Sequence, residues 1–97
     1  MTESDIQRDI IAAYEAVGAV VMRMNAGHLR VGGRSIKLAP PGTPDLFVIG
    51  KRRSLWVEVK KPGGELRPDQ IKMIDTLRDR GHEVIVARGI DDLSFPV

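Results

Sequence analysis

The stretch from Pro44 to Lys60 decides the fold, and it reads PDLFVIGKRRSLWVEVK. Two apolar runs flank a turn of glycine and basic residues, a pattern that is typical of a β-hairpin. Because side chains alternate along a strand, Glu58 and Lys60 share one face, and Asp45 begins the partner strand. We therefore expect three ionisable side chains to meet at one end of a sheet.

Two carboxylates and a lysine in this arrangement predict a divalent-metal site. Carboxylate oxygens suit Mg²⁺ and Mn²⁺, which usually keep several waters and contact substrate phosphates. Lys60 can hold a water or stabilise negative charge that develops on a phosphate. The alternative is an exposed ladder of acidic and basic side chains, which a Glu-x-Lys triplet in a strand most often forms.

The order Pro44-Asp45, a spacer, then Glu58-Val59-Lys60 resembles the PD-(D/E)XK nuclease motif. Gly42-Thr43 upstream and Gln70 downstream make the chain similar to the VRR-NUC branch, found as small stand-alone phage nucleases and as domains of larger repair nucleases. The resemblance runs from Glu3 to about Arg88. It implies an α/β fold with a restriction-endonuclease-like core, in which helices flank a central mixed β-sheet.

The resemblance also implies roles for individual residues in a DNA endonuclease that uses Mg²⁺ or Mn²⁺ as its cofactor. The implied metal ligands are Glu3, Asp45, Glu58 and the backbone carbonyl of Val59. The implied catalytic residues are Asp45, Glu58, Lys60 and Gln70. Lys60 would orient the attacking water or help to deprotonate it. Whether the site binds one metal or two stays open.

An amphipathic helix from about Ser4 to Val17 is predicted by apolar residues at helical spacing. Either Thr2 or Ser4 can cap it. Glu3 is aligned with the apolar stripe that this helix is expected to bury, and Gln7 follows one turn later on the same face. Glu3 has two interpretations, as the metal-site acid that the resemblance implies or as a residue that only caps the helix.

A second helix is predicted to open at Pro68, which suits the first helical position, and to end at Gly81. Gln70 lies in its first turn, where it either belongs to the active site or serves as an N-terminal cap. A strand from His82 to Arg88 follows. A strand, a helix and a strand in this order predict a crossover that pairs the last strand parallel to the one carrying Glu58.

The loop from Ala39 to Pro44 is predicted to be stiff because it contains three prolines. A rigid loop would fix the point at which Asp45 enters the sheet, as a metal site requires. Gly42 is expected to let the backbone pass close to a phosphate or to a second subunit.

The middle of the chain is basic, with ten Lys and Arg against three Asp and Glu between Arg23 and Arg67. It holds a predicted strand over residues 19–24 and a predicted hairpin with its turn at Gly32-Gly33. The charge pattern predicts binding of a polyanion, and the alternative is a solvated basic face. The predicted nucleic-acid contacts are Arg23, His28, Arg30, Arg34, Lys37, Arg52, Arg53 and Lys61. For His28, contact with phosphate is preferred to a role as catalytic base.

Composition narrows the classes of protein that fit. The chain has 97 residues and no cysteine, so we expect one VRR-NUC-like nuclease domain over residues 1–97, without disulfides or thiolate metal sites. It lacks an apolar run of about 18 residues, and its first residues are acidic where a signal peptide would be basic. We expect a cytoplasmic location, in a host cell if the chain is phage-encoded, and no contact with a membrane.

The function that fits these patterns is metal-dependent endonuclease activity on DNA, with four-way junctions or other branched DNA as the favoured substrate. The partners are therefore branched or duplex DNA. Small stand-alone relatives act as homodimers, so a homodimer is expected. The alternative is a non-catalytic nucleic-acid-binding module, or a subunit of a larger nuclease complex, with a nuclease-like fold.

Overall fold

A computed structural model of the chain describes residues 1–24, 26 and 28–97. In chain order, its elements are α1 (Glu3–Ala16), β1 (Val20–Arg23), β2 (His28–Val31), β3 (Arg34–Lys37), β4 (Leu46–Ile49), β5 (Ser54–Val59), α2 (Pro68–Asp79), β6 (Val84–Ala87) and the 3-10 turn η1 (Ile90–Asp92). None of the helices in these described ranges combines the length and the apolar character needed to cross a membrane.

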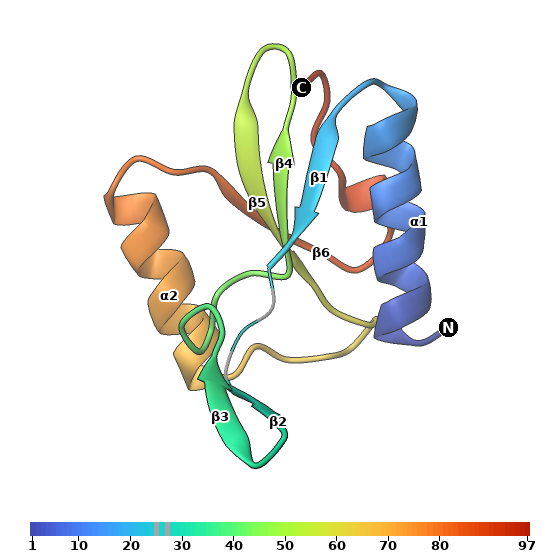
Figure 1. Ribbon diagram of the computed structural model, residues 1–97. Helices are drawn as coiled ribbons and strands as arrows, with labels where there is room; N and C mark the ends of the chain where they lie inside the picture. The colour runs from blue at the N-terminus through green and yellow to red at the C-terminus, as the bar shows by residue number, and fades with distance from the viewer. Residues whose placement is uncertain (25, 27) are drawn as a thin grey trace.

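The described residues form a mixed sheet in the order β1-β4-β5-β6. The β1–β4 and β4–β5 pairs are antiparallel, and β5 pairs parallel with β6. Figure 1 shows this sheet with α1 on one side and α2 on the other. The predicted α/β architecture is confirmed, together with the hairpin around residue 50 and the parallel last strand.

One face of the sheet carries the hydrophobic core. Helix α1 buries Ile6, Ile10 and Tyr14 against it, at the spacing that the sequence predicts. The strand residues on this face alternate with outward-facing ones, and they are Leu46, Val48, Leu55, Val57 and Val59. This packing fixes α1 across the ends of β4 and β5, where the candidate site lies.

Helix α1 begins with a capping box made by Thr2 and Asp5. The Asp5 N–H donates to Thr2 Oγ1 at 3.1 Å, and the Thr2 N–H donates to Asp5 Oδ2 at 3.0 Å. Each side chain thus satisfies a backbone donor that the helix leaves free. Because Thr2 and Asp5 fill both places, the interpretation of Glu3 as the cap is wrong.

The hairpin of β2 and β3 stands apart from the main sheet as a two-stranded ribbon. Its turn is Gly32-Gly33, as predicted, with both glycines at positive φ (57° and 78°). Figure 1 shows the hairpin projecting beyond the body of the domain, whose principal extents are 43 × 30 × 29 Å. The chain thus carries an arm outside its core.

The loop before β4 docks on the first turn of α2. Gly42 has a φ of 86°, and a Cβ at this position would lie 2.3 Å from the Asp69 carbonyl oxygen. The close approach expected at Gly42 is therefore made to the backbone of α2 and not to a phosphate or a second subunit. Pro44 is fully buried in the same loop. This contact sets the distance between the loop that carries Asp45 and the helix that carries Gln70.

Candidate active site

Asp45 and Glu58 meet where β4 begins and β5 ends. Leu46 pairs with Val57 across the two strands, so Asp45 lies one step further on, opposite Glu58. The Val59 N–H donates to Asp45 Oδ2 at 2.7 Å. The Asp45 carbonyl accepts a hydrogen bond of 2.8 Å from the Met24 N–H, just after β1. Both the side chain and the backbone of Asp45 are therefore fixed to neighbouring strands.

Glu58 is buried, with 2% of its surface exposed. Its Oε1 accepts a hydrogen bond of 3.2 Å from Gln70 Nε2. Its Oε2 is buried and has no hydrogen-bond partner among the described residues. A buried carboxylate oxygen without a partner is costly for the folded chain, so this atom marks a place where a cation or a proton would be stabilised.

The surroundings of Glu58 raise the pKa of its carboxyl group from 4.5 to about 8. Burial is the largest cause, followed by the charge of Asp45 and by the hydrogen bond that a protonated Glu58 carboxyl can donate to Asp45. The Lys60 ammonium lowers the same pKa, and the charge of Glu3 raises it. The charges of Glu3, Asp45 and Lys60 thus all act on Glu58. The adjacent acids Asp45 and Glu58 together favour the binding of a proton or a cation.

Lys60 follows β5 directly and is 6% exposed. Its N–H donates to the Ala87 carbonyl of β6 at 3.0 Å, so the backbone continues the parallel pairing. Alternation along the strand places its side chain on the face of Glu58. A buried ammonium near two carboxylates is partly compensated by them, which holds the lysine at this end of the sheet.

The Gln70 side chain forms two hydrogen bonds, one at the start of α2 and one to Glu58. Its Oε1 accepts a hydrogen bond of 2.9 Å from the Arg67 N–H, which caps the start of α2. Its Nε2 donates to Glu58 Oε1, as described above. The amide group therefore ties the first turn of α2 to the carboxylate at the centre of the candidate site.

A cleft of about 190 Å³ opens beside these groups, lined by Glu3, Ser4, Gln7, Asp45 and Val59. The first turns of α1 thus face Asp45 and the end of β5 across it. The helical spacing of Glu3 and Gln7 indicates this face from sequence. Ser4 is not predicted from sequence as a residue of this cleft, because a serine at a helix start has the signature of a cap.

The donors at this cleft fit a hard divalent cation. Glu3, Asp45 and Val59, with its backbone carbonyl, line the cleft, and the buried Glu58 carboxylate lies opposite Asp45 on the neighbouring strand. Among the described residues, no group of three or more His, Asp and Glu side chains is gathered closely enough to hold a metal ion unaided. Mg²⁺ commonly binds proteins through one or two carboxylates and keeps its waters. Two carboxylates, one with an unpartnered buried oxygen, satisfy that requirement.

Several of the predicted nucleic-acid contacts lie close to the cleft or on the projecting arm. Arg23 pairs with Leu46, the residue after Asp45, and Lys61 follows Lys60 at the surface. Arg30 and Arg34 are exposed on the β2–β3 hairpin. His28 and Lys37 belong to the same hairpin, but their side chains lie outside the described part of the structure.

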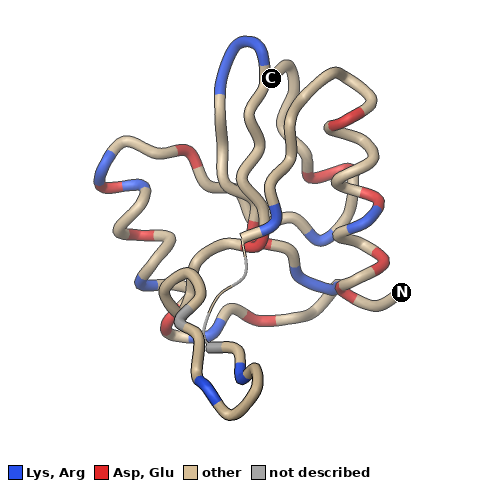
Figure 2. The backbone as a smooth tube through the Cα atoms, viewed as in Figure 1, with Lys and Arg blue, Asp and Glu red and all other residues tan. Residues whose placement is uncertain are grey.

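Arg52 and Arg53 lie at the other end of the sheet. Gly50 lies five residue steps after Asp45, which amounts to about 17 Å at the rise of a strand. Figure 2 shows this basic turn at one tip of the molecule, away from the acidic start of β4. Arg53 forms an ion pair with Glu83 (3.4 Å between Nε and Oε1) and donates a hydrogen bond to Ser94 Oγ. The structure therefore does not bring these two arginines to the cleft.

Comparison with known proteins places this arrangement in a family. The family model described as "VRR-NUC domain" matches residues 1–91. The chain belongs to the VRR-NUC domain family. A solved structure titled "VRR_NUC domain" is similar to this one, with a TM-score of 0.68 and 28% sequence identity over 94% of this chain and 89% of that chain. The comparison with curated proteins found no match. Membership of the VRR-NUC family indicates a nuclease-type module.

Proposed function

We propose that this VRR-NUC domain is a metal-dependent DNA endonuclease of the PD-(D/E)XK type, which hydrolyses phosphodiester bonds. The observation that carries the proposal is the pair of carboxylates at the cleft, where buried Glu58 leaves Oε2 without a hydrogen-bond partner among the described residues. Such a pair lowers stability and repels phosphate. A protein that only binds DNA gains nothing from it, whereas a metal site requires it.

Each side chain at the cleft has a defined task in this proposal. Asp45 is held by the Val59 N–H, and Glu58 is held by Gln70, so both carboxylates are positioned before substrate arrives. Lys60 holds the attacking water and balances negative charge on the phosphate. Mg²⁺ or Mn²⁺, bound by Asp45, Glu58, the Val59 carbonyl and Glu3 directly or through water, would supply a Lewis acid that polarises the phosphate and stabilises the leaving oxygen.

Branched DNA, such as a four-way junction, is the substrate that we favour. Apart from Arg52 and Arg53 at the far end of the sheet, the predicted basic contacts lie in two separate places: Arg23 and Lys61 beside the cleft, and Arg30 and Arg34 on the projecting β2–β3 arm. Phosphate contacts fix the orientation of a nucleic acid without reading its sequence. Two separate basic surfaces suit branched DNA, because one surface can contact the duplex that is cut while the other contacts a second duplex arm. This distribution of charge supports a preference for DNA structure over DNA sequence.

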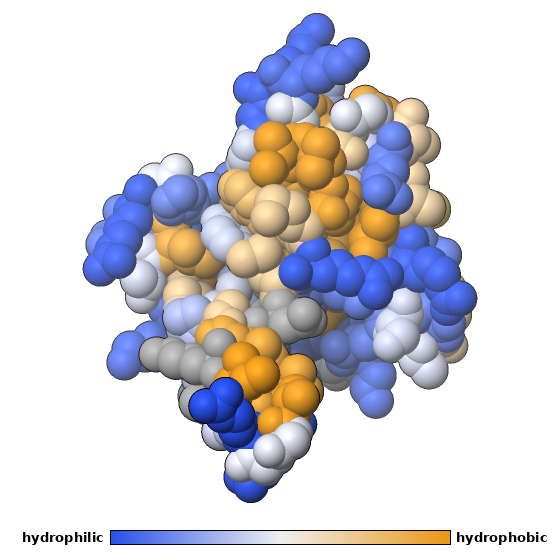
Figure 3. Space-filling view, in the orientation of Figure 1, coloured by the Kyte–Doolittle hydropathy of each residue, from blue (hydrophilic) through white to orange (hydrophobic). Residues whose placement is uncertain are grey.

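A homodimer is part of the same proposal. The sheet face opposite α1 carries Val20, Met22, Phe47, Ile49 and Trp56, which the strand register places on one side. We call it the outer sheet face. Val20 is 59% exposed and Met22 is 46% exposed. Figure 3 shows a hydrophobic area over these strands. An apolar face of this kind supports contact with a second copy, and two-fold symmetry would present two sites to opposing DNA strands.

The alternative is a VRR-NUC fold that binds nucleic acid without cutting it, alone or within a larger complex. One observation favours this non-catalytic alternative: the described residues include no group of three acidic side chains close enough to hold a metal ion. Cleavage by the purified chain distinguishes the two functions.

The test is cleavage of a labelled four-way junction beside linear duplex and flap DNA, each in Mg²⁺, Mn²⁺ or EDTA. We expect metal-dependent cutting with preference for branched DNA, and a loss of at least about 100-fold in Lys60→Ala. Lys72→Ala is the matched control, because Lys72 is exposed on α2 and points away from Gln70 on the helix. Binding without cutting in every metal would overturn the nuclease and support the alternative.

Metal binding has a test that does not depend on catalysis. Mg²⁺ or Mn²⁺ should raise the Tm of the wild type and of Lys60→Ala, because both keep the carboxylates. At 100 times its Kd, a ligand adds about 2.7 kcal/mol to the free energy of unfolding. Asp45→Asn should lose most of this stabilisation. Equal shifts in all three proteins would show that the ions bind elsewhere.

A further inference from the structure

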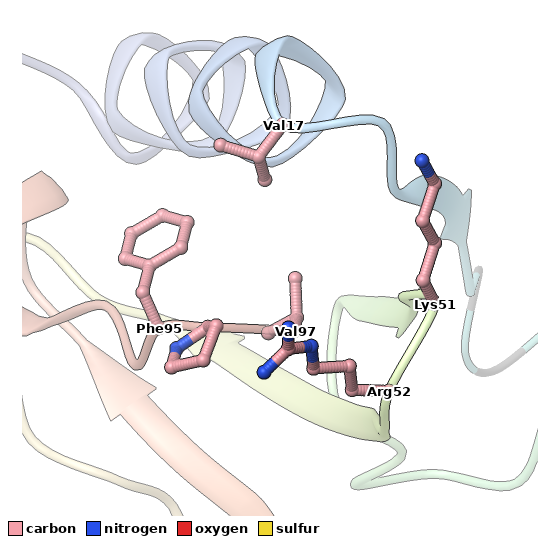
Figure 4. Close-up of a pocket in the computed structure, with 6 residues that line it drawn as sticks. Val17, Lys51, Arg52, Phe95 and Val97 are labelled. Atoms are coloured by element: carbon pink, nitrogen blue, oxygen red, sulfur yellow. The ribbon is translucent and has the colours of Figure 1, made fainter.

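A second hollow lies at the end of the sheet opposite the cleft. It has a volume of about 440 Å³ and is lined by Val17, Lys51, Arg52, Phe95, Pro96 and Val97. Figure 4 shows Val17, from the end of α1, facing Phe95 and Val97 across an open space, with Lys51 and Arg52 along its border. We call this hollow the end pocket. It shares no residue with the cleft.

The walls of the end pocket are apolar and accessible. Val17 is 54% exposed and Phe95 is 47% exposed, so both would gain from being covered. The Phe95 ring packs on the ring of Tyr14, with centroids 5.1 Å apart. This contact fixes one wall against the hydrophobic core, because Tyr14 is fully buried.

The floor of the end pocket is held by backbone contacts. The Val97 carbonyl accepts hydrogen bonds from the Arg52 N–H at 2.7 Å and the Arg53 N–H at 3.2 Å. Gly50 allows this approach, because a Cβ at that position would lie 2.0 Å from the same oxygen. The pocket is thus formed before anything binds, which lowers the entropic cost of binding.

The border of the end pocket is positively charged. Lys51 and Arg52 are exposed, and within the described residues neither side chain takes part in an ion pair. The third cation of this turn, Arg53, is paired with Glu83. No Asp or Glu side chain is among the described residues that line the pocket. An apolar hollow with two unpaired cations is complementary to an apolar group that has carboxylates beside it.

These features favour a protein segment over DNA. Affinity for DNA comes from many phosphate contacts along a strand, and this border offers two cations, about a strand's length from the cleft. A concave apolar hollow instead suits one large side chain, which is how short segments commonly gain affinity from a protein surface.

We propose that the end pocket binds an acidic segment of a partner protein. One apolar side chain of that segment enters between Val17 and Phe95, and Asp or Glu residues beside it pair with Lys51 and Arg52. Because the cleft lies at the other end of the sheet, the partner holds the VRR-NUC domain while leaving the cleft open to DNA.

Fluorescence anisotropy with a labelled short peptide of Asp and Glu around one central leucine tests the proposal. We expect saturable binding with a Kd of about 10–100 µM. Replacing the leucine with glycine should weaken binding at least about tenfold, because it removes the apolar contact. Replacing the acids with lysines should have an effect of similar size, because it removes the charge pairing with Lys51 and Arg52.

Variants of the exposed lining residues locate the binding site. Val17→Asp and Lys51→Glu should each weaken peptide binding about tenfold or more, while their Tm and any DNA cleavage stay at the wild-type level. Lys72→Glu reverses the charge of an exposed lysine on α2 and should bind the peptide like the wild type. Cleavage that persists in variants without peptide binding separates this proposal from the proposed function.

Three results would overturn the proposal. The first is no binding of the peptide at concentrations up to about 1 mM. The second is binding that is equal with glycine in place of leucine, or that is unchanged in Val17→Asp and Lys51→Glu. The third is tighter binding of a single-stranded DNA oligonucleotide through the same two residues, which would assign the end pocket to nucleic acid.

Discussion

Glu58 is an ionisable side chain held in a buried environment. Its carboxyl group is buried beside Asp45, and the hydrogen bond from Gln70 satisfies one of its two oxygens. Burial, followed by the charge of Asp45, raises the pKa of Glu58, so without a cation the folded chain tends to keep a proton on this carboxyl group. Stability of the metal-free protein is therefore linked to pH through this residue.

The first prediction concerns this linkage. Glu58 titrates at about 8 in the folded chain against 4.5 when unfolded, so its contribution is fully present below pH 4.5 and is lost as pH rises toward 8. Urea unfolding in EDTA should show the wild type losing up to about 1.4 kcal/mol per pH unit in this window relative to Glu58→Gln. Glu65→Gln, at an exposed position, should follow the wild type. Parallel pH profiles for wild type and Glu58→Gln would contradict the linkage.

The second prediction concerns Gly42, where positive φ and close packing coincide. Gly33→Ala should cost about 1 kcal/mol, because Gly33 has positive φ and no atom within 4 Å of its Cβ position. Gly42→Ala should cost about 3 kcal/mol or more, because the methyl group also meets the Asp69 carbonyl. Denaturant unfolding of both variants measures the difference. Equal losses would mean that the loop and α2 separate freely.

At the residue scale, the sequence predicts those side-chain positions that are determined by the alternation of side chains along a strand. Asp45, Glu58 and Lys60 converge because their spacing and the hairpin leave little choice. The contact between Gly42 and Asp69, and the hydrogen bond from Gln70 to Glu58, depend on how a loop and a helix pack in three dimensions. No local pattern contains that information.

At the scale of elements, the helices and strands follow their sequence signals closely. The predicted helix of about Ser4 to Val17 is α1, and apolar spacing also indicates its buried face. The separation of the β2–β3 ribbon from the main sheet cannot be predicted from sequence, because a hairpin pattern does not indicate whether its two strands pair with any other strand. That separation gives the domain its projecting arm.

The third prediction tests this arm as a DNA contact. Replacing both Arg30 and Arg34 with alanine removes two exposed cations from the hairpin. The slope of log Kd against log salt for a four-way junction should decrease by about 1.8, since each phosphate contact contributes about 0.9. Exposed Arg80, beyond α2, offers a matched control in Arg80→Ala. An unchanged slope in the double variant would show that the arm does not touch DNA.

At the scale of the whole molecule, α1 and α2 cover the sheet unequally. Helix α1 closes one face, whereas the outer sheet face keeps exposed apolar side chains. The sequence indicates that the strands are amphipathic, but it does not indicate how much of each sheet face the helices cover. The end pocket is hidden from sequence for a similar reason, since its walls come from residues 17, 51–52 and 95–97.

The fourth prediction concerns assembly through the outer sheet face. We expect the wild type to sediment as a dimer and Val20→Asp to sediment as a monomer, because the substitution places a charge in an apolar contact. Ile71→Asp is the matched control, since Ile71 is an exposed apolar residue on α2. Sedimentation equilibrium measures the masses. A monomeric wild type, or a dimer that survives Val20→Asp, would argue against this face.

The glycine turn of the projecting arm also divides the chain in a useful way. A break between Gly32 and Gly33 would leave Glu3 on one piece and Asp45, Glu58 and Lys60 on the other, while the main sheet would lose only a covalent connection. The buried face of α1 would still favour reassembly of the two pieces. The fold is therefore suited to fragment complementation, in which two halves restore the cleft between Glu3 and Asp45 when fused proteins bring them together.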